Sequence, residues 1–306
     1  MTHQDADRAG AEAAERDVPA FSVLLPVYAG DRAEWLRRAF ASITTEQELP
    51  PDEVVLVRDG PVPEELEAVI TQLREESGVP VQYVPLPQNL RLAGALSVGL
   101  ERCTHEVVAR ADADDICLPQ RFARQIPAMA ELDLLGSAMA EFSAESPEDS
   151  AIMQGTSATR SRPETGEEIR AYAAFHNPFN HPSIVFRKSA VLAAGGYQDM
   201  PLMEDYWLFV RMIADGARVG NVGEPLVAYR VGEELFERRG GLRALRSDLR
   251  FQRGTHALGI TTRGQYLRNL ALRAGYRLVP GRLRAWGYNK FVADRNERRR
   301  PVGEQE

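Results

Sequence analysis

Cysteine is nearly absent from this chain, which has only Cys103 and Cys117 in 306 residues. Neither thiol lies in a spacing typical of metal ligands, and no disulfide framework can be built from them. The sequence therefore argues against a cysteine-based zinc site and a disulfide-stapled secreted domain. We expect both thiols to be small buried apolar groups in a reducing compartment.

Long hydrophobic runs are also missing. No window approaches the roughly 18 consecutive apolar residues that a transmembrane helix needs. Residues 1–17 are polar and rich in alanine, without the apolar core of a signal peptide. We therefore expect a disordered tail over residues 1–18 and a cytoplasmic location.

Lysine is scarce, since only Lys188 and Lys290 accompany the arginines, and basic charge is concentrated at one end. Residues 238–300 hold sixteen arginines and Lys290 against three acidic residues, although the net charge of the chain is −7. A basic segment on an acidic body indicates an anionic partner. No recognised nucleic-acid module accompanies the charge, so we expect no nucleic acid and instead an anionic membrane surface.

The basic segment, residues 236–306, interleaves its arginines with large apolar side chains, as interfacial amphipathic helices do. These apolar residues are Leu267, Leu270, Leu272, Tyr276, Leu278, Leu283, Trp286, Tyr288 and Phe291. We expect peripheral binding to the inner face of the plasma membrane. The alternative is a C-terminal helix that packs on the body and keeps its arginines in water.

Short apolar runs alternate with helical patterns in the first part of the chain. The runs cover residues 21–28, 53–60, 81–86 and 107–111; the helical patterns follow residue 28 and cover residues 63–76 and 92–103. This alternation predicts an α/β fold with a Rossmann-like, doubly wound and mostly parallel sheet. Residues 19–120 are therefore interpreted as a nucleotide-binding half.

The pattern continues less regularly over residues 121–235, which we interpret as an acceptor-binding half. It predicts helices over residues 119–132, 189–194 and 203–215, and strands over residues 134–142 and 184–186. Residues 145–168 are polar and are expected to be irregular, as long functional loops often are.

The most informative motif is Arg110-Ala111-Asp112-Ala113-Asp114-Asp115, which ends the fourth apolar run. Ligands of open α/β sheets bind at the carboxyl ends of the strands, where these carboxylates should emerge. Three carboxylates this close repel one another unless a cation lies among them, and a hard divalent ion prefers oxygen ligands. The simpler interpretation is an acidic loop that caps the following helix.

Further candidates lie at the same edge of the predicted sheet. Asp59 ends the second strand and could accept a hydrogen bond from a base or a ribose hydroxyl, although Asp-Gly is also a common turn. Pro26 and Tyr28 end the first strand, where a ring could hold a base. Arg110 could pair with the neighbouring carboxylates or with phosphate.

Glu204 and Asp205 open a predicted helix, where carboxylates are favoured electrostatically. They could equally be a general base and its supporting neighbour. His181, in a tight polar turn, could hydrogen-bond a ligand or a pyrophosphate, or be purely structural.

Four short motifs, taken in order, resemble the family 2 glycosyltransferases, nucleotide-sugar transferases of the GT-A fold. They are Val23–Tyr28, Val55–Gly60, Ala109–Asp115 and Met203–Tyr206. Within that family the chain is most similar to bacterial exopolysaccharide and O-antigen enzymes of the amylovoran-biosynthesis type. The resemblance extends from about Phe21 to Val231, residues 19–235 being the expected GT-A domain, and is looser beyond.

The resemblance implies a role for each matching residue. The end of the first strand and Asp59 would bind the nucleoside, UDP being favoured, and Asp112 would contact ribose or metal. Asp114 would ligate Mg²⁺ or Mn²⁺ bridging the diphosphate. Asp205 would be the catalytic base, assisted by Glu204. The resemblance also implies inversion at the anomeric carbon and a glycan or lipid-linked acceptor.

The chain departs from this family at two points. Relatives often carry Gly two residues after Asn89, where this chain has Arg91, a candidate for reaching phosphate. The Gln-x-x-Arg-Trp motif of processive synthases is missing, which favours addition of one or a few sugars.

Two alternatives to a glycosyltransferase stay open on the sequence. One is a sugar nucleotidyltransferase, although the glycine-rich phosphate loop that such enzymes need is missing near the first strand. The other is a non-catalytic nucleotide- or glycan-binding scaffold.

Overall fold

The computed structural model describes residues 18–143, 158–231 and 242–278. They belong to two compact units. One comprises Met1–Asp199 and Glu204–Glu233, and the other comprises Met200–Met203 and Glu234–Glu306. Most of the tail expected over residues 1–18 lies outside the described residues, as do residues 144–157, 232–241 and 279–306.

The first unit begins with the predicted parallel strands, paired in the order β3-β2-β1-β4. These are β1 (Phe21–Tyr28), β2 (Glu53–Asp59), β3 (Val81–Pro85) and β4 (Val107–Arg110). The helices between them are α2 (Ala33–Ile43), α3 (Glu64–Glu76) and α4 (Arg91–Arg102). Every one of these elements was predicted, because buried strands read as apolar runs and amphipathic helices show regular apolar spacing.

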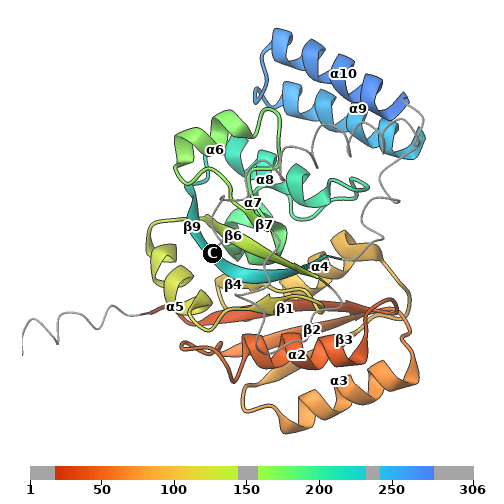
Figure 1. The fold of residues 1–306 in the computed structure, drawn as a ribbon, viewed down its shortest axis with the longest axis vertical. Helices are drawn as coiled ribbons and strands as arrows, with labels where there is room; N and C mark the ends of the chain where they lie inside the picture. The colour runs from red at the N-terminus through yellow and green to blue at the C-terminus, as the bar shows by residue number, and fades with distance from the viewer. Residues whose placement is uncertain (1–17, 144–157, 232–241, 279–306) are drawn as a thin grey trace, which may run out of the picture. The chain divides into compact units, whose positions relative to one another are not determined.

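Helices cover both faces of these strands (Figure 1). Leu36 of α2 and Ile70 of α3 are buried in one core with alternate residues of β1, such as Val23 and Leu25. On the opposite face α4 approaches so closely that a Cβ at Gly99 would lie 2.4 Å from Leu24. Helix α4 therefore packs closely against β1 and β2.

The rest of the sheet is mixed. Beyond β4 the order continues β8-β6-β9-β5, with β7 paired to β6. Strand β8 is antiparallel to β4 and β6, whereas β6 and β9 are parallel. The strands are β5 (Ile116–Cys117), β6 (Leu134–Ser143), β7 (Ala158–Arg160), β8 (Val185–Arg187) and β9 (Val219–Val231).

Three local predictions need correction. The helix expected over residues 119–132 is a short α5 (Arg121–Gln125) followed by the 3-10 turn η1 (Pro127–Ala130), because proline lacks the N–H that continues an α-helix. Within the segment expected to be irregular, residues 158–160 form β7 and α6 (Gly166–Tyr172) begins. Strands β5 and β9 were not predicted.

The remaining helices of the first unit are close to prediction. The 3-10 turn η2 (His181–Ser183) precedes β8, and α7 (Lys188–Ala193) follows it. Helix α8 (Glu204–Ala214) starts with the Glu204-Asp205 pair. Cys103 and Cys117 are both free and buried, as expected.

The second unit contains a pair of helices, α9 (Leu242–Ala257) and α10 (Arg263–Leu278). Asp248 of α9 accepts a 2.9 Å hydrogen bond from Arg273 of α10, and Asn269 donates one of 3.0 Å to Gln252. The apolar residues expected beyond Leu278 lie outside the described part of the chain. None of the described helices is long and apolar enough to cross a bilayer.

Candidate functional site

The acidic motif lies at the carboxyl end of β4, where the sequence placed it. One carboxylate oxygen from each of Asp112, Asp114 and Asp115 lies within 4.8 Å of the others. Asp115 is buried, and the other two are half-buried. The three acids are therefore gathered at one point and not spread along a solvated loop.

Crowding perturbs these carboxylates. Burial, and then the charge of Asp112, raise the pKa of Asp114 to about 6. Burial and both neighbouring acids raise the pKa of Asp115 well above its usual range. Oδ1 of Asp115 accepts a 2.9 Å hydrogen bond from the Arg230 amide, whereas its buried Oδ2 has no partner among the described residues. A buried oxygen without a donor beside two further carboxylates suits a hard cation.

Two arginines lie at this cluster: Arg230, whose Nε donates a 2.9 Å hydrogen bond to the Asp114 carbonyl, and Arg110. The two terminal nitrogens of Arg110 contact the two carboxylate oxygens of Asp112, and the Arg110 side chain is only 3 % exposed. Below it, the fully buried Arg121 donates a 2.7 Å hydrogen bond to the Arg110 carbonyl. Arg110 thus holds the Asp112 carboxylate from one side. Of the two partners predicted for Arg110, a neighbouring carboxylate and phosphate, the structure shows the first.

Asp31 also belongs to this edge, and the sequence reasoning missed it. Oδ2 of Asp31 accepts a 2.9 Å hydrogen bond from the Tyr28 amide. Burial raises the pKa of Asp31 to about 7, and the charges of Asp114 and Asp112 add to the rise. A carboxylate three residues after a strand that ends at the same edge was the signal available.

The end of β1 presents an aromatic ring. Tyr28 is 43 % exposed, while Pro26 is half-buried. A Cβ at Gly30 would lie 2.5 Å from the far end of the Tyr28 side chain, so a larger residue there would displace this ring.

Asp59 is buried at the end of β2 and connects that strand to α4. Its Oδ1 accepts a 2.6 Å hydrogen bond from the Leu90 amide, and its carbonyl accepts one of 3.2 Å from Asn89. Gly60 follows with φ +83°, so the Asp-Gly turn also exists. Both interpretations of Asp59 are compatible with this geometry.

Arg91 has a left-handed backbone, with φ 65°. Glycine adopts this conformation freely, whereas arginine adopts it at a cost. The Arg91 guanidinium pairs with Asp199 at 3.1 Å, and both side chains are more than half exposed.

Glu204 and Asp205 form the first turn of α8, as predicted. Asn177, from the loop after α6, donates a 2.7 Å hydrogen bond to Oδ2 of Asp205. Burial raises the pKa of Asp205, against the opposing effects of the Tyr206 amide, Asn177 and Arg110. Asn177 carried no motif and was not identified from the sequence.

His181 is buried in η2 and contacts Tyr197 and Phe209. Its Nε2 lies 3.1 Å from the Tyr197 hydroxyl, and its ring centroid lies 5.9 Å from that of Phe209. Burial and the charge of Arg110 hold the pKa of His181 well below its usual value, so the ring is neutral. Tyr197 is buried beside it.

Electrostatic coupling links the two acidic motifs. Burial raises the pKa of Tyr197, and the charges of Asp205, Asp112 and Glu204 raise it further. Arg110 opposes that rise, as it opposes the rise at Asp205. The first unit therefore brings the Asp112–Asp115 cluster and the Glu204-Asp205 pair around Arg110 and Tyr197.

Comparison with known proteins gives the same family throughout. Residues 22–193 match the model of glycosyl transferase family 2. The chain is 39 % identical over 273 residues to the amylovoran biosynthesis glycosyltransferase AmsE of Erwinia amylovora, covering 88 % of this chain and 98 % of that protein. It is 32 % identical over 279 residues to an Escherichia coli UDP-Gal:alpha-D-GlcNAc-diphosphoundecaprenol beta-1,3-galactosyltransferase, covering 90 % and 98 %.

Solved structures agree on the fold. Staphylococcus aureus TarS 1–349, in complex with UDP-GlcNAc, superposes with a TM-score of 0.61 at 14 % identity and covers 89 % of this chain and 76 % of that one. A mannosyltransferase from Pyrobaculum calidifontis, in complex with GDP-Man and Mn²⁺, gives a TM-score of 0.60 at 16 % identity over 91 % and 83 %. The expected GT-A fold is confirmed.

Proposed function

The chain belongs to glycosyl transferase family 2, and from that membership we propose that it transfers a sugar from a nucleoside diphosphate to a hydroxyl of a glycan or lipid-linked acceptor during synthesis of a bacterial surface polysaccharide. The resemblance seen in the sequence is confirmed, and the chain is a glycosyltransferase. A UDP-sugar is the favoured donor, because the relative at 32 % identity is named for UDP-Gal.

The observation that carries this proposal is that the charge of Arg110 acts on two carboxylates with different tasks. Arg110 pairs with Asp112 in the acidic cluster, and its charge lowers the pKa of Asp205 at the start of α8. Sugar transfer needs the donor site and the base in one site, because the acceptor hydroxyl must lose its proton as it attacks and the diphosphate departs.

The nucleoside would lie at the ends of β1 and β2. The exposed ring of Tyr28 offers a stacking surface beside Pro26, and Asp59 offers an acceptor for a base or ribose group. Arg91 and His181 complete the proposed donor site. The neutral His181 ring can accept or donate one hydrogen bond, but it adds no charge for the diphosphate.

Asp114 and Asp112 are proposed to hold Mg²⁺ or Mn²⁺. When bound, the ion would supply a Lewis acid for the charge that develops on the leaving diphosphate. Asp115 lies in the same cluster, and its buried Oδ2 provides a further oxygen. Arg110 would fix Asp112 in place, as partners of metal-bound carboxylates commonly do.

Asp205 is proposed as the general base. Its carboxylate would take the proton of the acceptor hydroxyl while that oxygen forms a bond to the anomeric carbon. The bond from that carbon to the diphosphate breaks on the opposite side, so its configuration inverts and no covalent enzyme intermediate forms. Asn177 would orient Asp205, and Glu204 would assist it.

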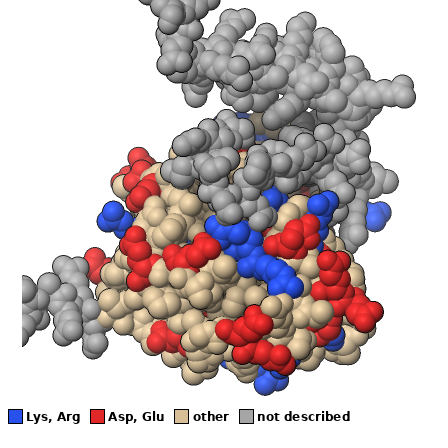
Figure 2. Space-filling view, turned by 60° about the horizontal axis from the view of Figure 1, so that its bottom comes forward, with Lys and Arg blue, Asp and Glu red and all other residues tan. Residues whose placement is uncertain are grey.

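Membrane docking is proposed for the C-terminal segment. Leu267 and Leu272 of α10 are 64 % and 65 % exposed, and Arg263 and Arg268 are exposed on the same helix, which contains no acidic residue. In contrast, Figure 2 shows several groups of Asp and Glu around a cluster of Lys and Arg on the face that it displays. Apolar side chains among arginines match the interface of an anionic bilayer.

Calorimetric titration with UDP, GDP and dTDP, with and without Mn²⁺, tests the proposed donor site. We expect UDP to bind in a Mn²⁺-dependent manner and the other two nucleotides to bind more weakly. Failure of all three nucleotides to bind would overturn the donor site. Slow hydrolysis of a UDP-sugar that requires Mn²⁺ would then separate an enzyme from the alternative of a nucleotide-binding scaffold.

A further inference from the structure

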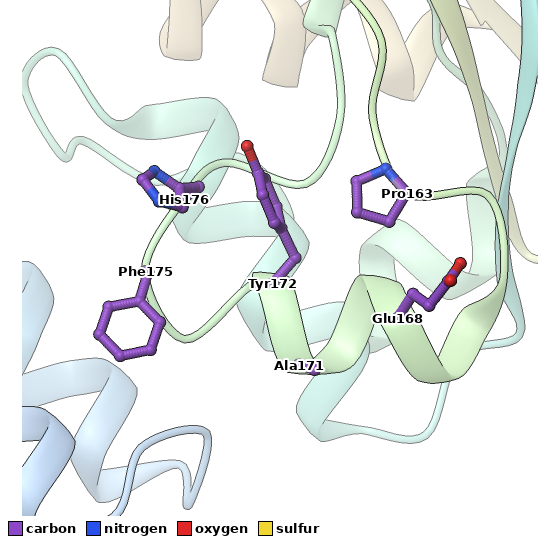
Figure 3. A pocket seen from close by; sticks show the side chains of 6 residues that line it. All are labelled: Pro163, Glu168, Ala171, Tyr172, Phe175 and His176. Atoms are coloured by element: carbon purple, nitrogen blue, oxygen red, sulfur yellow. The ribbon is translucent and has the colours of Figure 1, made fainter.

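A pocket of about 510 Å³ opens beside α6, and none of the residues proposed above for donor, metal or base lines it. Its lining residues are Pro163, Glu168, Ala171, Tyr172, Phe175 and His176 (Figure 3). Sites for small molecules commonly have volumes of about 300–1,000 Å³. The pocket is therefore large enough for one or more sugar rings.

The pocket is rich in aromatic rings. Figure 3 shows the Tyr172 ring standing between His176 and the ring of Pro163. The centroids of Tyr172 and His176 lie 4.9 Å apart, with 34° between the ring planes. Such rings offer flat apolar faces that suit the C–H face of a pyranose.

Polar groups lie beside these rings. Oε2 of Glu168 accepts a 2.8 Å hydrogen bond from the Thr165 hydroxyl in a capping box, which fixes the carboxylate at the start of α6. Carboxylate, phenol and imidazole groups can all bind sugar hydroxyls. Arg162, which precedes Pro163, hydrogen-bonds the Tyr172 hydroxyl, and none of the described residues that line the pocket is Lys or Arg. A diphosphate would therefore lie beside the Glu168 carboxylate without a cation in the lining itself.

The pocket is anchored to the helix that carries the proposed base. Asn177, which follows the pocket residue His176, donates the 2.7 Å hydrogen bond to Asp205. The Tyr206 hydroxyl donates one of 2.7 Å to the Ala173 carbonyl, and Arg170 donates one of 2.7 Å to the Ile213 carbonyl. Helix α6 and the loop after it are thus tied to α8 at three points.

We propose that this pocket binds a neutral pyranose ring of the acceptor and so selects the molecule whose hydroxyl reaches Asp205. Naming the ring as the acceptor's rests on the proposed function; its binding in the pocket rests on the lining alone. A hydrocarbon chain fits less well, because it offers no hydrogen bond to the polar groups of the lining. The aromatic rings and the hydrogen-bonding groups together match a ligand with one apolar face and a polar rim.

Saturation-transfer NMR tests this site without relying on catalysis. The probes are methyl α-N-acetylglucosaminide, a neutral pyranoside, and decyl phosphate, an anionic phosphate ester with an alkyl chain. We expect saturation of the pyranose C–H protons by the unaltered protein, and at least a fivefold loss with Tyr172→Leu or His176→Leu. Tyr172→Phe keeps the ring and should retain the signal, as should Leu192→Ala, a change at an exposed side chain of α7.

Three results would overturn the pocket assignment. They are no pyranose signal with the unaltered protein, an undiminished signal with both leucine variants, and saturation of the decyl chain alone, which would indicate a lipid site. Thermal unfolding of each variant checks its folding. Mn²⁺-dependent UDP binding, measured separately, should be unchanged in the variants, and its absence from the unaltered protein would count against the donor site and not against this pocket.

Discussion

Nδ2 of Asn177 lies 2.7 Å from Oδ2 of Asp205 and joins the loop after α6 to the first turn of α8. The hydrogen bond lowers the pKa of Asp205, which burial raises. Removing it with Asn177→Ala should therefore raise the pKa of the base and move the acidic limb of the kcat profile to higher pH. Loss of orientation should also lower kcat by about tenfold, less than the 10²–10⁴-fold typical of a general base.

Asp205→Asn gives the reference for that experiment. It should lower kcat by about 10²–10⁴-fold while leaving UDP affinity unchanged, because the base is not part of the donor site. If Asn177→Ala keeps both the rate and the pH profile of the unaltered enzyme, the hydrogen bond is structural. Near-normal transfer by Asp205→Asn would assign the base to Glu204 or to another group.

Asp114→Asn removes a proposed metal ligand with little change in size. We expect the gain in UDP affinity from Mn²⁺ to fall by more than about 100-fold, since loss of groups that merely support a ligand costs 10–100-fold. Calorimetry with and without Mn²⁺ measures this change in affinity. The control is Glu75→Gln, which removes one carboxylate from an exposed position of α3. Metal dependence that survives in Asp114→Asn would return the acidic motif to the role of a helix cap.

Asp31 makes the free energy of unfolding of the metal-free protein depend on pH. Its pKa is raised to about 7, so between its unfolded value near 4 and pH 7 the folded protein binds more protons than the unfolded chain. Stability from this group is therefore highest at low pH and is lost as pH rises through 7. Asp31→Asn keeps an oxygen for the Tyr28 amide but lacks the charge.

The difference in Tm between Asp31→Asn and the unaltered protein isolates that effect from other titrating groups, including His181. Without metal, the Tm of the variant relative to that of the unaltered protein should rise by about 2–4 °C when the pH is raised from 5 to 8. This is the shift in Tm expected for about 1 kcal/mol in a chain somewhat smaller than this one. Saturating Mn²⁺ should reduce the gain, because a cation among the carboxylates favours their charged forms. A pH-independent difference would mean that Asp31 is not perturbed.

Arg91 stores strain in its left-handed backbone. Arg91→Gly and Arg91→Ala both remove the exposed ion pair with Asp199, which is worth at most about 1 kcal/mol. Only glycine relieves the strain, so Arg91→Gly should be about 1 kcal/mol more stable than Arg91→Ala by denaturant unfolding. In the middle of α3, Ala68→Gly should have the opposite sign and cost about 1 kcal/mol. Equal stability of the two Arg91 variants would refute the strain.

Membrane docking should depend on the exposed side chains of α10. Leu267→Gln combined with Leu272→Gln removes apolar contact without changing charge, and Arg263→Gln combined with Arg268→Gln removes two charges. The arginine pair should weaken co-sedimentation with vesicles of anionic phospholipid by about 30-fold, since each charge near such a surface contributes about 1 kcal/mol. The leucine pair should weaken it as well, because it removes apolar contact with the bilayer. Exposed Leu192→Ala on α7 is the control. Vesicle binding equal to that of the unaltered protein would support the alternative of a helix packed on the body.

The first half of the domain followed directly from the sequence. Strands β1, β2 and β4 are apolar runs because most of their residues are buried on both faces, and the helices between the strands show regular apolar spacing. The sequence also placed Asp59 and Asp112–Asp115 at one edge, because the carboxyl ends of parallel strands meet there. Family membership followed from four short motifs in the correct order.

Tertiary structure decided the groups that act on those motifs. Asp31, Asn177, Tyr197 and Arg230 carry no motif of their own, and they meet the acidic residues only through contacts between distant segments, such as the 2.9 Å hydrogen bond from the Arg230 amide to Asp115. Strand β9 was missed for the same reason, since it is completed by pairing with β6. Local sequence determines periodicity and turns, whereas burial, charge coupling and the raised pKa values arise when the folded chain removes these groups from water.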